Sequence, residues 1–212
     1  MTESLAEGLS RADDMIVRCW WCVGSADYVE YHDTEWGVPV TDEVRLFEKI
    51  ALEGFQSGLS WLTILRKRDN FRAAFKGFDP EQVARFGARD VTRLLGDAGI
   101  VRHRGKIEAT IANAKALLDL REREGSLTNF VWGYVPPNPH RVRTRGDVRA
   151  TGAESIALSK ELKRRGWKFV GPTTCYAFFQ AMGLVNDHLE GCARFAPVQA
   201  LRTKTVARLR TR

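Results

Sequence analysis

Apolar residues recur at intervals of three and four along most of this chain, and this helical periodicity restricts its fold more than any other feature. Long alternating runs of apolar and polar residues, which would indicate β-strands, are absent. Helix-capping residues agree with the periodicity. Asp79 and Pro80 supply an N-cap and a proline at the first helical position, and Gly125 ends the longest periodic segment. The sequence therefore predicts an all-α fold.

The same signals predict where the helices lie. One helix follows Thr41 and Asp42, and others cover residues 80–86, 90–97, 106–124, 155–165 and 172–182. Residues 134–151, rich in proline and arginine, form the one long predicted loop. At 212 residues and 44% apolar content the chain can bury one substantial core or two small helical lobes. We expect one globular unit over residues 16–197.

The two ends of the chain differ from this unit in composition. Residues 1–15 contain few large apolar side chains and predict a flexible extension. Residues 198–212 contain five basic residues and no acid, which predicts a basic tail.

Charge and cysteine content narrow the functional classes. Lys and Arg number 33 against 26 acids, and the resulting net charge of +7 suits a polyanionic partner, although charge alone more often means a solvated basic surface. Four cysteines are too few for a disulfide scaffold and predict reduced thiols. Neither a membrane span nor a signal pattern is visible, so we expect a cytoplasmic protein.

A glycine-bounded turn with basic residues separates two of the predicted helices. It contains Gly99, Arg102, Arg104, Gly105 and Lys106. Backbone N–H groups at a helix N-terminus, with basic side chains beside them, can grip a DNA phosphate without reading the sequence, as in a helix-hairpin-helix. An ordinary turn with solvated basic residues explains this segment equally well.

Residues able to bind a metal lie near both ends of the predicted unit. Cys19 and His32 are at one end, and His188 and Cys192 are at the other. Two thiolates and two imidazoles make a closed, structural zinc site. Cys22 could replace His32 as a ligand, because Cys19-x-x-Cys22 is itself a metal-binding spacing. Unliganded cysteines and surface histidines are the simpler interpretation.

Aromatic residues are concentrated near the N-terminus, and one acid lies among the apolar residues that follow. The aromatic residues are Trp20, Trp21, Tyr28, Tyr31, Trp36 and Trp61, and the acid is Glu53. Aromatic faces and a carboxylate suit a flat cationic base, held by stacking and cation–π attraction. Aromatic residues also form ordinary cores, which is the more common use.

Several stretches, taken in order, resemble a known family. They are Arg18-Cys19, residues 28–39 (YVEYHDTEWGVP), 52–54 (LEG), 58–61 (GLSW), 98–100 (AGI), 102–107 (RHRGKI), 168–171 (KFVG) and 183–188 (GLVNDH). Together they resemble bacterial 3-methyladenine DNA glycosylase I over roughly residues 18–192. The resemblance implies a helix-hairpin-helix glycosylase fold, with the hairpin around residues 90–122. It also implies a zinc ion that joins the N- and C-terminal segments.

The resemblance also implies roles for individual residues. Zinc is held by Cys19, His32, His188 and Cys192, rather than by Cys22. Glu53 reads the flipped base, and Trp21, Trp61, Tyr28 and Tyr31 stack on it or line its pocket. Leu59 fills the gap left in the base stack, as an apolar wedge can. Gly99, Arg102, Arg104, Gly105 and Lys106 contact the DNA backbone.

The implied activity is hydrolytic excision of 3-methyladenine from alkylated double-stranded DNA, by a monomer that releases free 3-methyladenine. Methylation at N3 makes the base cationic and a good leaving group, so little acid catalysis is needed. Asp119 is the nearest candidate for a catalytic aspartate, but the family lacks one, and a solvated position on a helix is expected instead. Two alternatives stay open: an endonuclease III-like glycosylase and lyase with Lys106 as nucleophile, and a non-catalytic zinc DNA-binding module.

Overall fold

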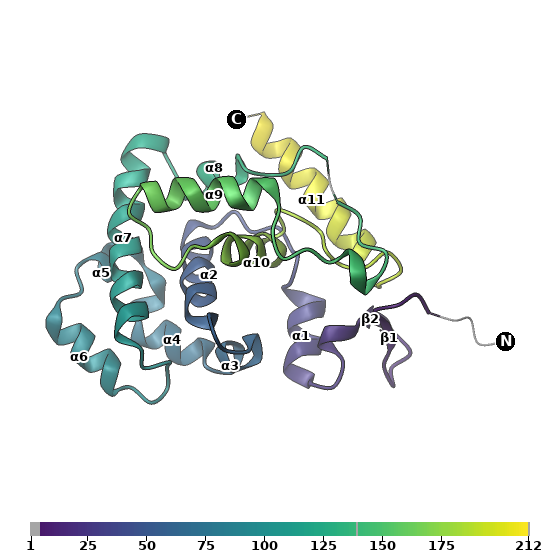
Figure 1. Cartoon of the computed structure of the whole chain (residues 1–212), viewed down its shortest axis with the longest axis horizontal. Coiled ribbons are helices and arrows are strands. Elements are labelled where there is room, and N and C mark those ends of the chain that lie inside the picture. Colours follow the sequence, from purple (N-terminus) through teal and green to yellow (C-terminus); the bar gives the residue numbers. More distant parts are fainter. Residues whose placement is uncertain (1–4, 139, 212) are drawn as a thin grey trace. The chain divides into compact units, whose positions relative to one another are not determined.

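The computed structural model describes residues 5–138 and 140–211 and confirms the helical prediction (Figure 1). The α-helices are α1 (Ala26–Thr34), α2 (Glu43–Gln56), α3 (Trp61–Arg66), α4 (Arg68–Ala74), α5 (Pro80–Ala84), α6 (Ala88–Gly96), α7 (Arg104–Glu124), α8 (Leu127–Trp132), α9 (Ala153–Arg164), α10 (Pro172–Met182) and α11 (Phe195–Arg210). Short 3-10 helices cover Trp20–Cys22, Lys76–Phe78 and Arg145–Asp147. None of the described helices is long and apolar enough to cross a membrane.

The chain divides into two compact units, so the residues predicted as a single unit, 16–197, are shared between them. The first unit comprises residues 1–40, 135–150 and 179–212, and the second comprises residues 41–134 and 151–178. Pro139, in the predicted loop, lies outside the described residues.

The second unit is built around α2 and α7. Asp42 caps α2 by accepting a hydrogen bond from the Arg45 backbone N–H at 2.9 Å, and Asp79 caps α5 with Pro80 at its first position, as predicted. Helix α7 packs against α2, α5, α6 and α8. Phenylalanines fill the core beside α2, and those that are fully buried are Phe47, Phe55, Phe71, Phe75, Phe78 and Phe178.

The first unit begins with a two-stranded antiparallel ribbon that the sequence did not predict. Strand β1 (Leu9–Arg11) pairs with β2 (Val17–Cys19), with Leu9 opposite Cys19. Leu9 packs against a buried cluster that includes Leu189 and Cys192. The fold therefore starts inside the segment expected to be a flexible extension, because Leu9 of β1 and its partner Cys19 of β2 both contribute to this cluster. Residues 1–4 of that segment lie outside the described residues.

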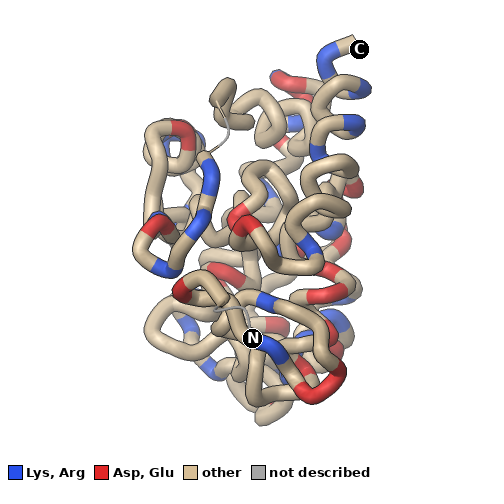
Figure 2. The backbone as a smooth tube through the Cα atoms, turned by 90° about the vertical axis from the view of Figure 1, so that its right-hand side faces the viewer, with Lys and Arg blue, Asp and Glu red and all other residues tan. Residues whose placement is uncertain are grey.

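Helix α11 occupies most of the segment predicted as a basic tail. Val198 is fully buried, and Arg202 is 6% exposed and donates from Nε to the Leu184 carbonyl at 2.9 Å. Near the C-terminus in Figure 2, Lys and Arg recur along α11. Val198 and Arg202, four residues apart, are buried on one side of α11, so this helix is packed into the first unit. The exposed basic residues of the segment dominate its sequence and led to the prediction of a tail. Arg212 lies outside the described residues.

Candidate functional site

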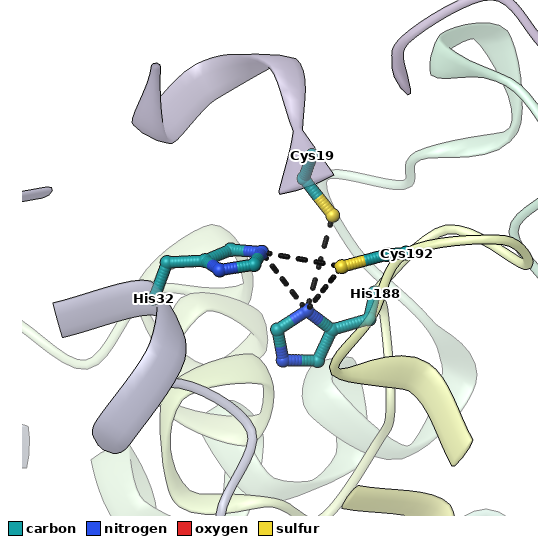
Figure 3. Close-up of side chains that lie close together, drawn as sticks. All are labelled: Cys19, His32, His188 and Cys192. Atoms are coloured by element: carbon teal, nitrogen blue, oxygen red, sulfur yellow. Dashed lines mark hydrogen bonds between the residues drawn. The ribbon is translucent and has the colours of Figure 1, made fainter. Parts of the chain in front are cut away.

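Four predicted metal ligands meet in the first unit, although they come from distant parts of the sequence (Figure 3). Their ligand atoms lie within 4.8 Å of one another, and all four residues, Cys19, His32, His188 and Cys192, are buried. His188 Nδ1 lies 3.2 Å from His32 Nε2, 3.6 Å from Cys192 Sγ and 3.8 Å from Cys19 Sγ. A tetrahedral zinc ion, with Zn–N of about 2.0–2.1 Å and Zn–S of about 2.3 Å, separates its ligand atoms by roughly 3.3–3.8 Å. The donor set therefore fits a closed zinc site.

Hydrogen bonds orient both imidazoles toward this cluster. His32 Nδ1 is 2.7 Å from the Asp33 carboxylate, and His188 Nε2 is 3.0 Å from the Trp36 carbonyl. Each ring thus donates outward and turns its other nitrogen inward, the arrangement of a metal-binding histidine. Arg18 holds Asp33 in turn, with Nε 2.9 Å from its carboxylate. Residues around the ligands therefore fix the geometry of the donor set.

The two thiols of the cluster differ in acidity. The hydrogen bond between them raises the pKa of Cys19 and lowers the pKa of Cys192, and bonds from His188 and His32 lower the Cys192 pKa further. The backbone N–H of Arg194 also donates to Cys192 Sγ at 3.4 Å. The cluster thus stabilises a thiolate, which is the form that binds a metal ion.

Cys22 is not part of the donor set. Its Sγ donates to the Cys19 carbonyl at 3.1 Å, and the cluster found among the described residues contains His32 instead. The choice of His32 that the family resemblance implied therefore agrees with the structure.

The aromatic residues of the N-terminal region surround Trp21, next to the metal ligands. The Trp21 ring lies 5.6 Å from Tyr28, 6.5 Å from Tyr31 and 5.0 Å from Trp36, measured between centroids. It also lies 5.3 Å from the His32 ring, edge to face. Because His32 is a member of the cluster, a metal ion bound there would also hold the position of Trp21.

Glu53, Trp61 and a third residue, Lys49, form a group in the second unit. Glu53 is 6% exposed on α2, and Trp61 is the first residue of α3. Lys49 Nζ lies 2.8 Å from Glu53 Oε1 and 3.2 Å from the centroid of the Trp61 ring. Lys49 has no distinctive signal in the sequence. Its spacing of four residues from Glu53 resembles that of an ordinary surface ion pair, and only the apolar residues around it on α2 indicate burial.

Leu59 is exposed in the turn after α2, and Lys106 holds this turn through hydrogen bonds to its backbone. Leu59 is 43% exposed, as a wedge residue must be. Lys106 was predicted to contact DNA, but it is 7% exposed, and its Nζ donates to the carbonyls of Phe55 at 2.9 Å and Ser57 at 2.5 Å. Lys106 is buried because the end of α2 leaves carbonyls without helical partners, and the ammonium satisfies two of them.

The remaining predicted DNA contacts lie in the turn between α6 and α7. Arg102 and Arg104 are exposed, and Gly99 and Gly105 are partly buried. The Gly99 N–H donates to Asp97 Oδ1 at 2.7 Å, so within this structure it is already paired. His103 caps α7 by accepting from the Lys106 N–H at 3.2 Å. Asp119 is exposed on α7, as expected for a solvated residue.

Comparison with known proteins supplies the family. The family model of methyladenine glycosylase matches residues 21–195. The chain is 52% identical over 177 residues to DNA-3-methyladenine glycosylase 1 of Escherichia coli (strain K12), covering 82% of this chain and 95% of the relative. It is 46% identical over 181 residues to DNA-3-methyladenine glycosylase of Haemophilus influenzae (strain ATCC 51907 / DSM 11121 / KW20 / Rd), covering 84% and 97%.

Solved structures agree with the sequence matches. A crystal structure of 3-methyladenine DNA glycosylase I superposes with a TM-score of 0.80 at 50% identity, covering 83% of this chain and 98% of the other. The enzyme from Staphylococcus aureus, solved to explain its recognition of 3-methyladenine, gives a TM-score of 0.79 at 39% identity, covering 82% and 93%. Since the family model and these relatives each span more than two thirds of the sequence, this chain belongs to the methyladenine glycosylase family.

Proposed function

We propose that this chain is a monofunctional DNA glycosylase that excises 3-methyladenine from alkylated duplex DNA in base excision repair. The observation that carries the proposal is the group formed by Glu53 and Trp61, which holds a cation, the Lys49 ammonium, between a carboxylate and an aromatic ring. A base methylated at N3 is a flat cation with the same requirements. The named activities of the relatives support the same substrate.

Glu53 recognises the flipped base in this proposal. Its carboxylate attracts the cationic ring and accepts hydrogen bonds from the base edge, while Trp61 stacks on the face. Trp21, Tyr28 and Tyr31 keep in this proposal the role that the family resemblance implies for them, which is to line the base pocket. Because the cationic base is already a good leaving group, the enzyme mainly flips and holds it while water adds to the sugar. No residue is assigned as a general base.

The DNA contacts follow from exposure and charge. Leu59 enters the base stack where the nucleotide has left, and Arg102 and Arg104 bind phosphates beside the first turn of α7, which contains Gly105. The enzyme acts as a monomer in the cytoplasm, where its DNA substrate lies.

The metal is zinc, and its role is structural. The four donors close the coordination sphere, leaving no position for a water nucleophile. Zinc bound there would join the segment carrying Cys19 and His32 to the one carrying His188 and Cys192, and would hold Trp21 through His32. Base excision itself falls to Glu53 and the aromatic residues.

The bonding of Lys106 favours hydrolysis over a lyase reaction. A lyase needs a free amine that attacks the sugar, whereas Lys106 Nζ is buried and donates to two carbonyls. We therefore expect the product DNA to stay uncut until alkali is added.

Release of free base from methylated duplex DNA tests the proposal. Glu53→Gln should lower the rate of 3-methyladenine release by about a hundredfold or more, because the amide has lost the charge that attracts the cation. Glu48→Gln is the matched control: Glu48 is also a buried acid of α2, but it pairs with Arg72 at 2.9 Å. Both variants are compared at equal metal content. Absence of release by the wild type would refute the proposal.

A further inference from the structure

Lys49 is a buried cation that lies where the proposed function requires another cation to bind. Its exposure is 5%, and it projects from the same helix as Glu53, one turn earlier. The ammonium contacts the two groups assigned to the base, with Nζ 2.8 Å from Glu53 Oε1 and 3.2 Å from the Trp61 ring centroid. At 3.2 Å from the centroid the ammonium covers the ring face, so a base cannot stack on that face while Lys49 stays.

Burial makes this arrangement costly to disrupt. A carboxylate as buried as Glu53 loses much of its hydration and needs a compensating charge. Lys49 supplies that charge in the base-free enzyme. A cationic base would replace the same ion pair and the same cation–π contact, so the Lys49 ammonium and the base are alternatives.

We propose that Lys49 competes internally with the base for Glu53 and Trp61 and so determines how tightly the enzyme holds that base. This inference rests on the proposed function of that pair. The ammonium fills the site before the cationic base of the nucleotide enters. Cleavage of the glycosidic bond leaves the bonding electron pair on the base, which becomes neutral while water adds to the sugar, and the ammonium then returns to Glu53. Competition of this kind weakens the hold on the free base and so hastens product release. Lysine suits the task, because its flexible four-carbon stem lets the ammonium move without displacing α2.

The affinity of the enzyme for free 3-methyladenine measures this competition. Lys49→Met and Lys49→Gln remove the competing charge, and each should bind free 3-methyladenine about tenfold more tightly than the wild type. Lys49→Arg keeps the charge and should bind it as the wild type does. Affinity for undamaged duplex should be the same in all four proteins, because a residue this buried makes no phosphate contact. Product inhibition of base release, fitted separately from the single-turnover rate, gives the required constants.

Two results would overturn the inference while leaving the proposed function intact. One is equal binding of 3-methyladenine by folded Met, Gln and Arg variants, with a wild type that releases the base. The other is weaker binding by the neutral variants. A wild type without base release would instead refute the proposed function.

A measurement on the wild type does not depend on whether the variants fold. The ε-methylene group of Lys49 is bonded to Nζ, which lies 3.2 Å from the centroid of the Trp61 ring, so its proton resonance should be shifted upfield by the ring current. It is assigned by its absence from the Lys49→Arg spectrum. Saturating 3-methyladenine should return this resonance to the ordinary lysine position. A resonance that stays upfield with the base bound would mean that Lys49 does not leave, and would overturn the inference.

Discussion

Buried lysines show how far a side chain's role can differ from what its charge suggests. Lys106 belongs to the basic segment 102–106, whose sequence predicts a DNA-binding surface. Its ammonium instead donates hydrogen bonds to the carbonyls of Phe55 and Ser57 at the C-terminal end of α2. Periodicity could place Lys106 beside the buried Ile107 on α7, but not show which carbonyls lie opposite. A tertiary partner decided its role.

Replacing Lys106 should reveal this role. Lys106→Met leaves two carbonyls without a donor and should lower the free energy of unfolding by about 2 kcal/mol at neutral pH. Lys115→Met, at an exposed position of the same helix, should change it by less than about 0.5 kcal/mol. Denaturant unfolding of the three proteins measures both. Equal stability of the two variants would mean that the hydrogen bonds of Lys106 to the end of α2 do not stabilise the fold.

The stabilisation by Lys106 should also depend on pH. Burial lowers the pKa of Lys106 below its usual 10.5, so over the interval between the folded pKa and 10.5 the unfolded chain binds more protons than the folded one. Stability therefore rises with pH in that interval. The free energy of unfolding of wild type relative to Lys106→Met should increase as the pH approaches about 10.5. If the difference in the free energy of unfolding between wild type and Lys106→Met decreased over this interval, the pKa of Lys106 would not be lowered by burial.

Gly54 illustrates a steric requirement at a single position. A Cβ there would lie 3.2 Å from Phe169 Cβ. Phe169 has a φ of 56°, unusual for a bulky residue, and the neighbouring Lys168 is held by two hydrogen bonds to Asn113. The clamp on Lys168 leaves Phe169 little freedom to move away.

Gly54→Ala should consequently lower the free energy of unfolding by about 1 kcal/mol or more. Gly96→Ala is the control, since a Cβ on that helical glycine meets nothing within 4 Å and should be neutral or stabilising by about 0.5 kcal/mol. Thermal unfolding of both variants distinguishes these outcomes. Two variants of equal stability would mean that Phe169 moves freely.

At the level of elements, six interior helices (α2, α5, α6, α7, α9 and α10) were predicted, whereas α1, α3, α4, α8 and the two ends of the fold were not. Local signals, such as Asp79-Pro80 and Gly125, located α5 and the end of α7. Strand β1 is only three residues long, and helix α11 buries only Val198 and Arg202. The stability of both elements therefore depends on what Leu9, Val198 and Arg202 contact in the first unit. Sequence periodicity records the apolar face of an element, whereas such contacts depend on the completed fold.

Two truncations test whether α11 belongs to the fold. A chain ending at Pro197 loses the buried Val198 and Arg202, and its first unit should unfold several degrees lower, since burying a valine side chain alone stabilises by about 1.5 kcal/mol or more. A chain ending at Thr205 keeps both residues and should unfold close to the full-length chain. If the two truncated chains unfolded at the same temperature, residues 198–205 would not stabilise the first unit, as predicted for a tail.

At the level of the whole molecule, composition and resemblance predicted the donor set better than spacing did. Spacing alone left Cys22 and His32 as alternatives, because it cannot show that Cys22 Sγ binds the Cys19 carbonyl. The partnership of Glu53 with Trp61 was expected from the resemblance, but Lys49 between them was not. The spacing of Lys49 and Glu53 is that of any ion pair along a helix. The sequence therefore does not show that the Trp61 indole, rather than solvent, covers the pair.

Metal content should separate the two thiols. Cys192→Ser removes a ligand, so it should bind less than one zinc ion per chain and unfold at a lower temperature. Cys22→Ser should keep one zinc ion per chain, because the serine hydroxyl can still donate to the Cys19 carbonyl. Elemental analysis and thermal unfolding, before and after chelation, give both quantities. Loss of zinc from Cys22→Ser alone would reverse the assignment of ligands.

The interleaving of the chain has a consequence for protein synthesis. The buried cluster that closes the first unit draws on residue 19 and on residue 192, and the whole second unit lies between these positions in sequence. A ribosome therefore exposes Cys19 and His32 long before their partners exist. During this interval the early thiols are open to oxidation or to the wrong metal, and the nascent second unit can fold first. In the proposed zinc-bound protein, metal loading at all four donors is consequently a late event, which requires that synthesis has passed residue 192.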